Sequence, residues 1–173
     1  NELACVVWFN GCNMRCQYCY NDELVFNKIG NYSYDEVLEF LKTRVGLLDA
    51  VVLSGGEACN RSLVEFCQKI KELGFLIKID TNGTCFNNLA ELVHAELIDY
   101  IALDYKAPQY KFYDITKSNR FDEFEKTLSF LLTQKVYFEV RTTIHTDLLD
   151  CEDINFMIND LHSRGYKNNY YIQ

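Results

Sequence analysis

The stretch FLIKID, residues 75–80, has the alternating pattern of a β-strand with one charged face. Because successive strand residues point to opposite sides of a sheet, Lys78 and Asp80 lie on the same face. The stretches IALDYK (101–106) and FEVRTT (138–143) repeat this pattern, and alternation there groups Ala102 with Asp104 and Lys106, and Glu139 with Arg141 and Thr143. Charged side chains therefore recur on one face of three predicted strands.

This charged face distinguishes between two parallel α/β folds. A doubly wound sheet carries helices on both faces, so its strands are near-continuous apolar runs. Charges on one face instead favour a barrel whose interior is polar and holds a ligand. We therefore predict an incomplete (β/α)6 TIM-type barrel, with parallel strands inside and helices outside, and keep the doubly wound sheet as the alternative.

Short β-rich runs alternate with longer helical patterns along the rest of the chain, which implies parallel pairing through right-handed crossovers. A capping box from Ser33 to Glu36 starts the first predicted helix. The strands are expected over residues 3–9, 50–54, 75–80, 100–105, 137–144 and 169–172, and further helices over 61–73, 88–94, 121–134 and 152–164. No linker interrupts the pattern, so residues 1–173 are predicted to form one domain.

The overall composition excludes several classes of function. The 173 residues are 49% hydrophobic, enough for a buried core, yet no apolar run is long enough to cross a membrane. A formal net charge of -8 argues against a nucleic-acid-binding surface. The first residues lack the basic leader and cleavage site of a signal peptide. We therefore expect a cytoplasmic protein with no membrane and no nucleic-acid partner.

Eight cysteines in such a chain indicate metal-binding or catalytic thiols, because disulfide frameworks are typical of small secreted domains. Three of the cysteines lie in GCNMRCQYC, residues 11–19, with the spacing C-x3-C-x2-C directly after the first strand. The others are scattered and are interpreted as core or surface thiols: Cys5, Cys59, Cys67, Cys85 and Cys151.

The three clustered cysteines can converge on one metal centre because the loop between them is short. Structural zinc normally takes four ligands, and no fourth Cys or His lies nearby. Three thiolates suit a cubane iron–sulfur cluster better, since they hold three irons and leave the fourth open. We predict that Cys12, Cys16 and Cys19 ligate a [4Fe–4S] cluster, with a three-ligand zinc site as the alternative.

This cysteine loop resembles the signature of the radical S-adenosylmethionine (SAM) superfamily. Tyr18 matches the family's aromatic residue near the adenine of SAM; otherwise it is an ordinary loop aromatic. The stretch SGGE at 54–57 is similar to the family's Gly-Gly-Glu motif, which binds the amino group of SAM. Taken alone, its paired glycines indicate a strand-to-helix turn. The family commonly has Pro after the Glu, and Ala58-Cys59 here puts a thiol near the expected cofactor.

The ends of later strands carry the remaining candidates. Asp80 and Asn82 lie in DTNG (80–83), which alone indicates an Asn-Gly turn with a solvated Asp. Asp104 and Lys106 share a face, and a structural ion pair is their alternative role. Arg141 either contacts the SAM carboxylate or pairs with Glu139. The methionine end of SAM carries an ammonium and a carboxylate, so carboxylates and cations at neighbouring strand ends can hold it.

The motifs together resemble the small glycyl-radical-enzyme activases, most of all those of anaerobic ribonucleoside-triphosphate reductase. This resemblance implies reductive cleavage of SAM to a 5′-deoxyadenosyl radical and a glycyl radical on the reductase, with a flavodoxin- or ferredoxin-type electron donor. It implies no catalytic side chain beyond the cofactor-borne radical. The residues expected to bind SAM are Tyr18, Ser54, Gly55, Gly56, Glu57, Asp80, Asn82, Asp104, Lys106 and Arg141.

Two other functions remain open. One is a radical SAM enzyme that acts on a small molecule, as in the deazaguanine-forming synthases of similar size. The other is a non-catalytic iron–sulfur or zinc module. SAM cleavage driven by a small substrate without a partner protein distinguishes the first, and absence of SAM binding distinguishes the second.

Overall fold

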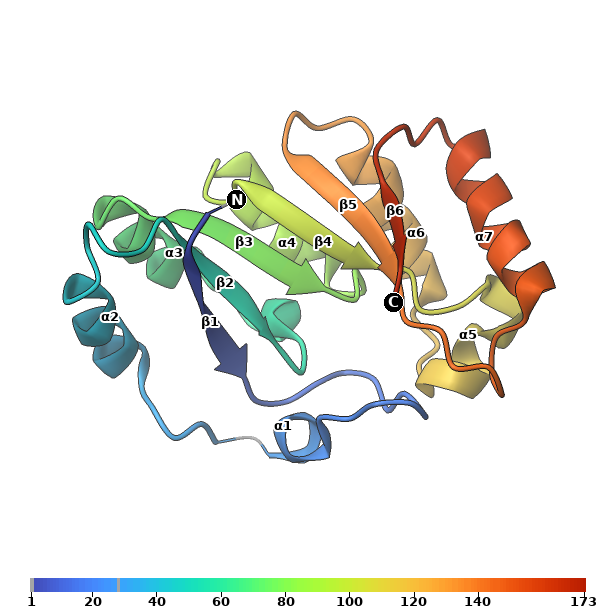
Figure 1. Cartoon of the computed structure of the whole chain (residues 1–173), viewed down its shortest axis with the longest axis horizontal. Helices are drawn as coiled ribbons and strands as arrows, with labels where there is room; N and C mark the ends of the chain where they lie inside the picture. The colour runs from blue at the N-terminus through green and yellow to red at the C-terminus, as the bar shows by residue number, and fades with distance from the viewer. Residues whose placement is uncertain (1, 28) are drawn as a thin grey trace.

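Six parallel strands form one sheet in the order in which they occur along the chain (Figure 1). The computed structural model describes residues 2–27 and 29–173. The strands are β1 (Ala4–Phe9), β2 (Ala50–Gly55), β3 (Leu76–Thr81), β4 (Tyr100–Asp104), β5 (Tyr137–Thr142) and β6 (Tyr170–Ile172). The sheet curves from β1 to β6, and these two edge strands do not pair with each other. The predicted incomplete barrel is therefore confirmed.

The sequential strand order also excludes the doubly wound alternative. When each right-handed crossover moves one strand further in the same direction, all the connecting helices fall on one face. Figure 1 shows α3, α4 and α6 behind the sheet and α2 and α7 at its two sides. The helices are α1 (Asp22–Phe26), α2 (Tyr34–Lys42), η1 (Ala58–Asn60, a 3-10 turn), α3 (Val64–Glu72), α4 (Phe86–His94), α5 (Gln109–Thr116), α6 (Phe121–Leu131) and α7 (Cys151–Ser163).

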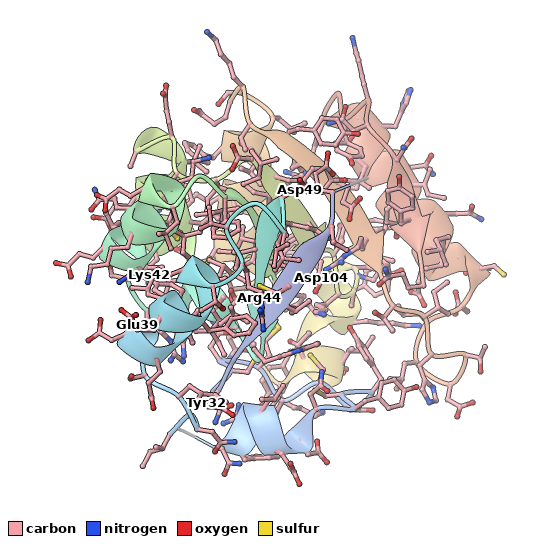
Figure 2. All side chains as sticks on the ribbon, turned by 60° about the vertical axis from the view of Figure 1, so that its left-hand side comes forward. Tyr32, Glu39, Lys42, Arg44, Asp49 and Asp104 are labelled. Carbon is pink, nitrogen blue, oxygen red and sulfur yellow. The ribbon has the colours of Figure 1, made fainter. Side chains whose placement is uncertain are left out.

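The two faces of the sheet differ as the alternation predicts. Ile77 and Ile79 of β3 and Ile101 of β4 pack under the helices and are almost completely buried. Burial of each such side chain contributes about 2 kcal/mol. The intervening residues, among them Asp104, line the concave face. In Figure 2, Asp104 lies near the middle of the molecule, whereas Glu39 and Lys42 project from the outer surface of α2.

Helix ends agree with the capping signals, but two helices were not expected. Ser33 and Glu36 form the predicted reciprocal capping box of α2. The sequence analysis predicts no helix between the fourth strand and residue 121, and this segment contains α5. Its sequence, QYKFYDIT, is rich in aromatic and β-branched residues that individually disfavour helix. The short α1 was also missed. Within the described residues, no helix is long and apolar enough to cross a membrane.

The backbones of β1 and β2 approach closely where the cysteine loop begins. The amide of Gly56 donates to the Phe9 carbonyl at 2.8 Å, and the amide of Glu57 donates to the Gly11 carbonyl at 2.9 Å. A Cβ atom at Gly56 would overlap the Gly11 carbonyl, whose carbon would lie 2.7 Å away. Gly55 is equally constrained, since it has φ +122° and its missing Cβ would overlap the backbone of Phe9. Glycines are therefore required here for the loop to lie across the strand ends.

We expect Gly56→Ala to lower the free energy of unfolding by about 1–3 kcal/mol, because a rigid backbone contact cannot relax to admit a methyl group. Gly30→Ala is the matched control, since its Cβ would meet nothing closer than the Tyr32 carbonyl oxygen at 3.6 Å. Denaturant unfolding of the two variants measures the difference. Equal stability of the two variants would contradict the close approach.

Candidate functional site

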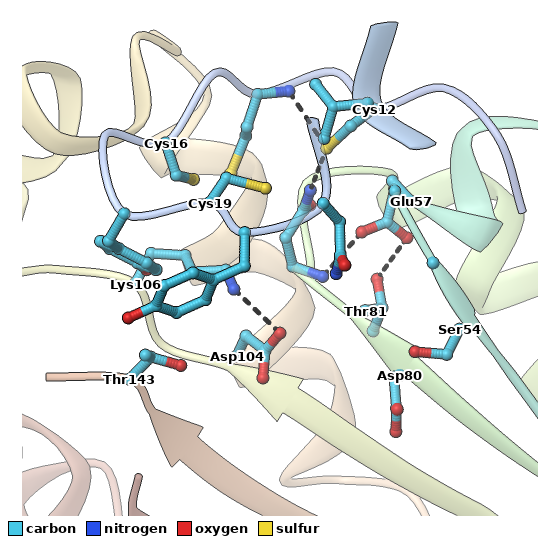
Figure 3. A pocket seen from close by; sticks show the side chains of 18 of the residues that line it. Cys12, Cys16, Cys19, Ser54, Glu57, Asp80, Thr81, Asp104, Lys106 and Thr143 are labelled. Carbon is cyan, nitrogen blue, oxygen red and sulfur yellow. Dashed lines mark hydrogen bonds and ion pairs between the residues drawn. The ribbon is translucent and has the colours of Figure 1, made fainter. Parts of the chain in front are cut away.

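A cavity of about 330 Å³ lies at the carboxyl ends of the strands, beneath the cysteine loop (Figure 3). Ligands of α/β barrels bind at this end. All thirteen residues predicted as cluster ligands or SAM contacts line the cavity: Cys12, Cys16, Tyr18, Cys19, Ser54, Gly55, Gly56, Glu57, Asp80, Asn82, Asp104, Lys106 and Arg141. The structure thus brings together residues from four strand ends and one loop.

The cysteine loop is held in place by backbone hydrogen bonds to two helical segments. The amide of Gly11 donates to the Leu24 carbonyl at 2.6 Å. The amides of Arg15 and Gln17 donate to the last carbonyls of α5, those of Thr116 at 2.8 Å and Ile115 at 3.0 Å. The otherwise unexpected α1 and α5 therefore anchor the loop that carries the three cysteines.

The cysteine thiols face a partly dehydrated space. Burial raises the pKa of Cys12, partly opposed by the Met14 amide that donates to its sulfur at 3.4 Å, and raises the pKa of Cys16 to about 11. A bound cation would reverse this effect, because metal ligation needs thiolates. In residues 2–27 and 29–173, no three His, Cys, Asp or Glu side chains are spaced to bind one metal ion. A cubane cluster does not need that convergence, because each thiolate holds a different iron.

Glu57 is a fully engaged buried carboxylate. Its oxygens accept hydrogen bonds from the Cys59 amide at 3.0 Å, the Thr81 hydroxyl at 2.8 Å and the Asn82 amide at 2.7 Å. Burial raises its pKa, and these donors lower it in part. The carboxylate caps η1, the 3-10 turn that follows Glu57 where the family commonly has Pro. Its hydrogen bonds to Thr81 and Asn82 also tie the end of β2 to the end of β3. Cys59 itself is completely buried and does not line the cavity, so its thiol lies behind the Glu57 carboxylate rather than in the cavity wall.

Asn82 connects the end of β3 to the cysteine loop. Its amide nitrogen donates to Asn13 Oδ1 at 2.9 Å and to the Cys12 sulfur at 4.0 Å. Its amide oxygen accepts from the Thr84 amide at 3.0 Å and from the Thr84 hydroxyl at 2.7 Å. Asn82 therefore uses both ends of its side chain within the protein, which makes it a support for the Cys12 segment.

Ion pairs link the charged candidates on the cavity floor. Lys106 Nζ lies 3.0 Å from Asp104 Oδ2, and Arg141 Nη2 lies 3.1 Å from Asp104 Oδ1 and 3.6 Å from Asp80 Oδ1. Burial lowers the pKa of Lys106, but the Asp104 carboxylate together with Tyr18 and Cys16 outweighs burial and leaves the pKa raised. Two expectations need correction: Asp80 is paired and largely buried rather than solvated, and the ion-pair partners of Arg141 are Asp80 and Asp104 rather than Glu139.

Two buried polar atoms among the described side chains lack a hydrogen-bond partner, and both belong to cavity residues. They are the Tyr18 hydroxyl and Asp80 Oδ1. The Tyr18 hydroxyl indicates a missing ligand, because an unpartnered buried polar group costs about 1–3 kcal/mol. Asp80 Oδ1 is compensated instead by ion pairs with Lys78 at 3.3 Å and Arg141 at 3.6 Å. Burial also raises the pKa of Tyr18, which keeps its hydroxyl available as a donor. A ligand with polar groups, such as SAM, fits the unpartnered Tyr18 hydroxyl.

Several cavity residues were missed by the sequence analysis. Trp8 lies opposite Ser54 in the register of β1 and β2, and Thr143 follows two residues after Arg141. The alternation placed Thr143 on the charged face without naming it as a site residue, and it could have selected Trp8 in the same way. Tyr20 and Val25 come from the loop and α1, for which no sequence signal existed.

Comparisons with known proteins agree with this arrangement. A family model described as the Radical SAM superfamily matches residues 6–154. The chain is 33% identical over 163 residues to a candidate glycyl-radical enzyme activating enzyme of Methanocaldococcus jannaschii, covering 88% of this chain and 66% of that protein. It is 31% identical over 105 residues to the pyruvate formate-lyase-activating enzyme of Clostridium pasteurianum, covering 56% of this chain and 44% of that enzyme. The chain thus spans less than two thirds of the length of each.

A solved structure shares the fold. Native anSMEcpe with bound AdoMet superimposes with a TM-score of 0.77 at 20% identity, over 98% of this chain and 51% of that chain. At this identity the likeness concerns the fold, which confirms the partial-barrel architecture independently of the strand order.

We expect Glu57→Gln to lower the free energy of unfolding by about 1–3 kcal/mol. The NH2 group of the new side chain would face hydrogen-bond donors of the protein in a buried site. Glu65→Gln, at an exposed position of α3, is the matched control and should have little effect. Denaturant unfolding of the protein without cofactors measures both. Unchanged stability of Glu57→Gln would show that the three hydrogen bonds do not hold the strand ends together.

Proposed function

Since the chain belongs to the radical SAM superfamily, we propose that it generates a glycyl radical on a partner enzyme. The similarity to a candidate activating enzyme over 88% of this chain is the observation that carries the proposal. Its cofactors are those of the superfamily, a [4Fe–4S] cluster and SAM. When bound, the cluster would supply the electron for reductive cleavage of SAM, and SAM would supply the 5′-deoxyadenosyl radical for removal of a hydrogen atom from the substrate.

Cys12, Cys16 and Cys19 would hold the cluster through their thiolates. Their loop crosses the strand ends because Gly55 and Gly56 admit close backbone approach. It is held there because backbone carbonyls of α1 and α5 accept hydrogen bonds from the amides of the loop. Burial of the thiols limits access of water to the centre.

The floor of the cavity would hold the methionine end of SAM. Asp80 and Asp104 offer carboxylates to an ammonium group, and Lys106 and Arg141 offer cations to a carboxylate. Tyr18 would contact the nucleoside end with its ring or its unpartnered hydroxyl. In this proposal Glu57 and Asn82 act by holding the strand ends and the Cys12 segment in place.

The open edge of the sheet supports a protein substrate. Within residues 2–27 and 29–173, no strand closes the space between β1 and β6, and the cavity reaches β1 through Trp8 and the end of β6 through Gln173. A polypeptide loop carrying a glycine could enter on this side. We take the partner to be anaerobic ribonucleoside-triphosphate reductase, with a flavodoxin- or ferredoxin-type electron donor. Eight free thiols fit a reducing, cytoplasmic setting.

The activase proposal is tested by electron paramagnetic resonance after anaerobic incubation of the protein with reductant, SAM and a candidate glycyl radical enzyme. A glycyl radical signal is expected on the anaerobic ribonucleotide reductase and not on pyruvate formate-lyase. A signal on pyruvate formate-lyase alone would overturn the choice of partner. If neither enzyme gives a glycyl radical signal and a small substrate drives SAM cleavage, the activase proposal would be replaced by that of a radical SAM enzyme acting on a small molecule.

We expect Cys16→Ser to lose most of its iron and the visible absorption of the cluster after anaerobic reconstitution, because a hydroxyl is a poor ligand for iron–sulfur clusters. Cys151→Ser, which alters an exposed thiol of α7, should retain both. Iron analysis and absorption spectra measure the difference. Equal iron in the two variants would rule out Cys16 as a cluster ligand.

A further inference from the structure

A charged group lies beside the cavity on the concave face, and none of its members lines the cavity. This floor cluster consists of Lys78, Tyr100 and Glu139. The Tyr100 hydroxyl donates to Glu139 Oε2 at 2.5 Å, and Lys78 Nζ lies 3.9 Å from Glu139 Oε1. Lys78 Nζ also lies 5.5 Å from the centre of the Tyr100 ring and 3.3 Å from Asp80 Oδ1. The cluster therefore contacts the cavity through Asp80.

Ala102 allows these contacts to form. In the strand register Ala102 lies between Asp80 of β3 and Glu139 of β5, on the concave face. Its side chain is a single methyl group, so side chains of β3 and β5 can meet above it. Two ion pairs do so, Lys78 with Glu139 and Asp80 with Arg141. Ala102 is completely buried even though its neighbours line an open face, which is consistent with coverage by these pairs.

The charges alternate in sign from one side of this face to the other. The order is Glu139, Lys78, Asp80, Arg141, Asp104 and Lys106, with separations of 3.9, 3.3, 3.6, 3.1 and 3.0 Å between successive groups. Asp80 Oδ1 thus lies between two cations and has no hydrogen bond. Arg141 is shared between two carboxylates. Among the described residues, removal of Lys78 would leave Arg141 as the only cation paired with Asp80, and we expect this to draw Arg141 away from Asp104.

We propose that Lys78, held by Glu139 and Tyr100, is a positioning residue that sets the orientation of Asp80 and the sharing of Arg141 between Asp80 and Asp104. Lys78 does so without contact with the ligand. The inference rests on the assignment of Asp80 and Arg141 as SAM contacts made above. The affinity for SAM then depends on Lys78, a side chain outside the cavity, through the carboxylate of Asp80.

Lys78→Met keeps the length of the side chain and removes its charge. We expect it to weaken SAM binding about tenfold, which is within the usual range for coupled neighbours. Lys78→Arg should restore most of the affinity, since it returns the charge. Lys69→Met, at an exposed position of α3, is the matched control and should bind SAM like the parent protein.

The decisive experiment is a double-mutant cycle on the anaerobically reconstituted protein, with SAM affinity measured by equilibrium dialysis. The four proteins are the parent, Lys78→Met, Asp80→Asn and the double variant. If Lys78 acts through Asp80, the double variant should bind SAM no more weakly than Asp80→Asn alone. Thermal melts establish that each variant is folded.

Each other outcome overturns the inference. Additive losses would mean that Lys78 acts independently of Asp80. An unchanged affinity of Lys78→Met beside a weakened Asp80→Asn would leave Asp80 as a SAM contact and remove the positioning role. Unchanged affinity of both variants would remove Asp80 from the SAM site, and the activase proposal would still stand on the glycyl radical signal.

Discussion

The parallel, in-register pairing of six strands is the constraint on which the site depends. Each strand pairs with its neighbour so that inward-facing positions align, for example Lys78 with Tyr100 and Ala102 with Glu139. Charges placed at every second position therefore meet across strands whether or not they are near in sequence. Because these side chains are only partly exposed, each must find an opposite charge. The result is an alternating set of ion pairs that ends at the cavity.

A second set of interactions holds the cysteine loop over this charged floor. Glu57 joins the ends of β2 and β3, and Asn82 joins the end of β3 to Asn13 of the loop. The two side chains lie in segments predicted to bind SAM, and they also make hydrogen bonds within the protein. The Tyr18 hydroxyl is a buried cavity group without a hydrogen-bond partner. The hydrogen bonds of Glu57 and Asn82 thus help to build the cavity that the predicted SAM contacts line.

Much of this architecture could be predicted from the sequence, because it follows from local patterns. The alternation of charged and apolar residues in 75–80 indicated an open barrel, and the cysteine spacing indicated a three-ligand centre. The helix α5 could not be predicted, because its residues have weak helical preference and it is stabilised by burial of Phe112 and Ile115. The partners of Arg141 were also beyond reach, since they depend on strand register. A side chain on β5 can meet Asp80 on β3 only because residue 102 between them is alanine.

The most direct test of the account is formation of 5′-deoxyadenosine by the reconstituted, reduced protein supplied with SAM. The account predicts release of 5′-deoxyadenosine and methionine in equal amounts, dependent on the cluster and abolished in Cys16→Ser. An intact [4Fe–4S] cluster that neither binds nor cleaves SAM would contradict it, and would leave the cavity as part of a non-catalytic iron–sulfur module.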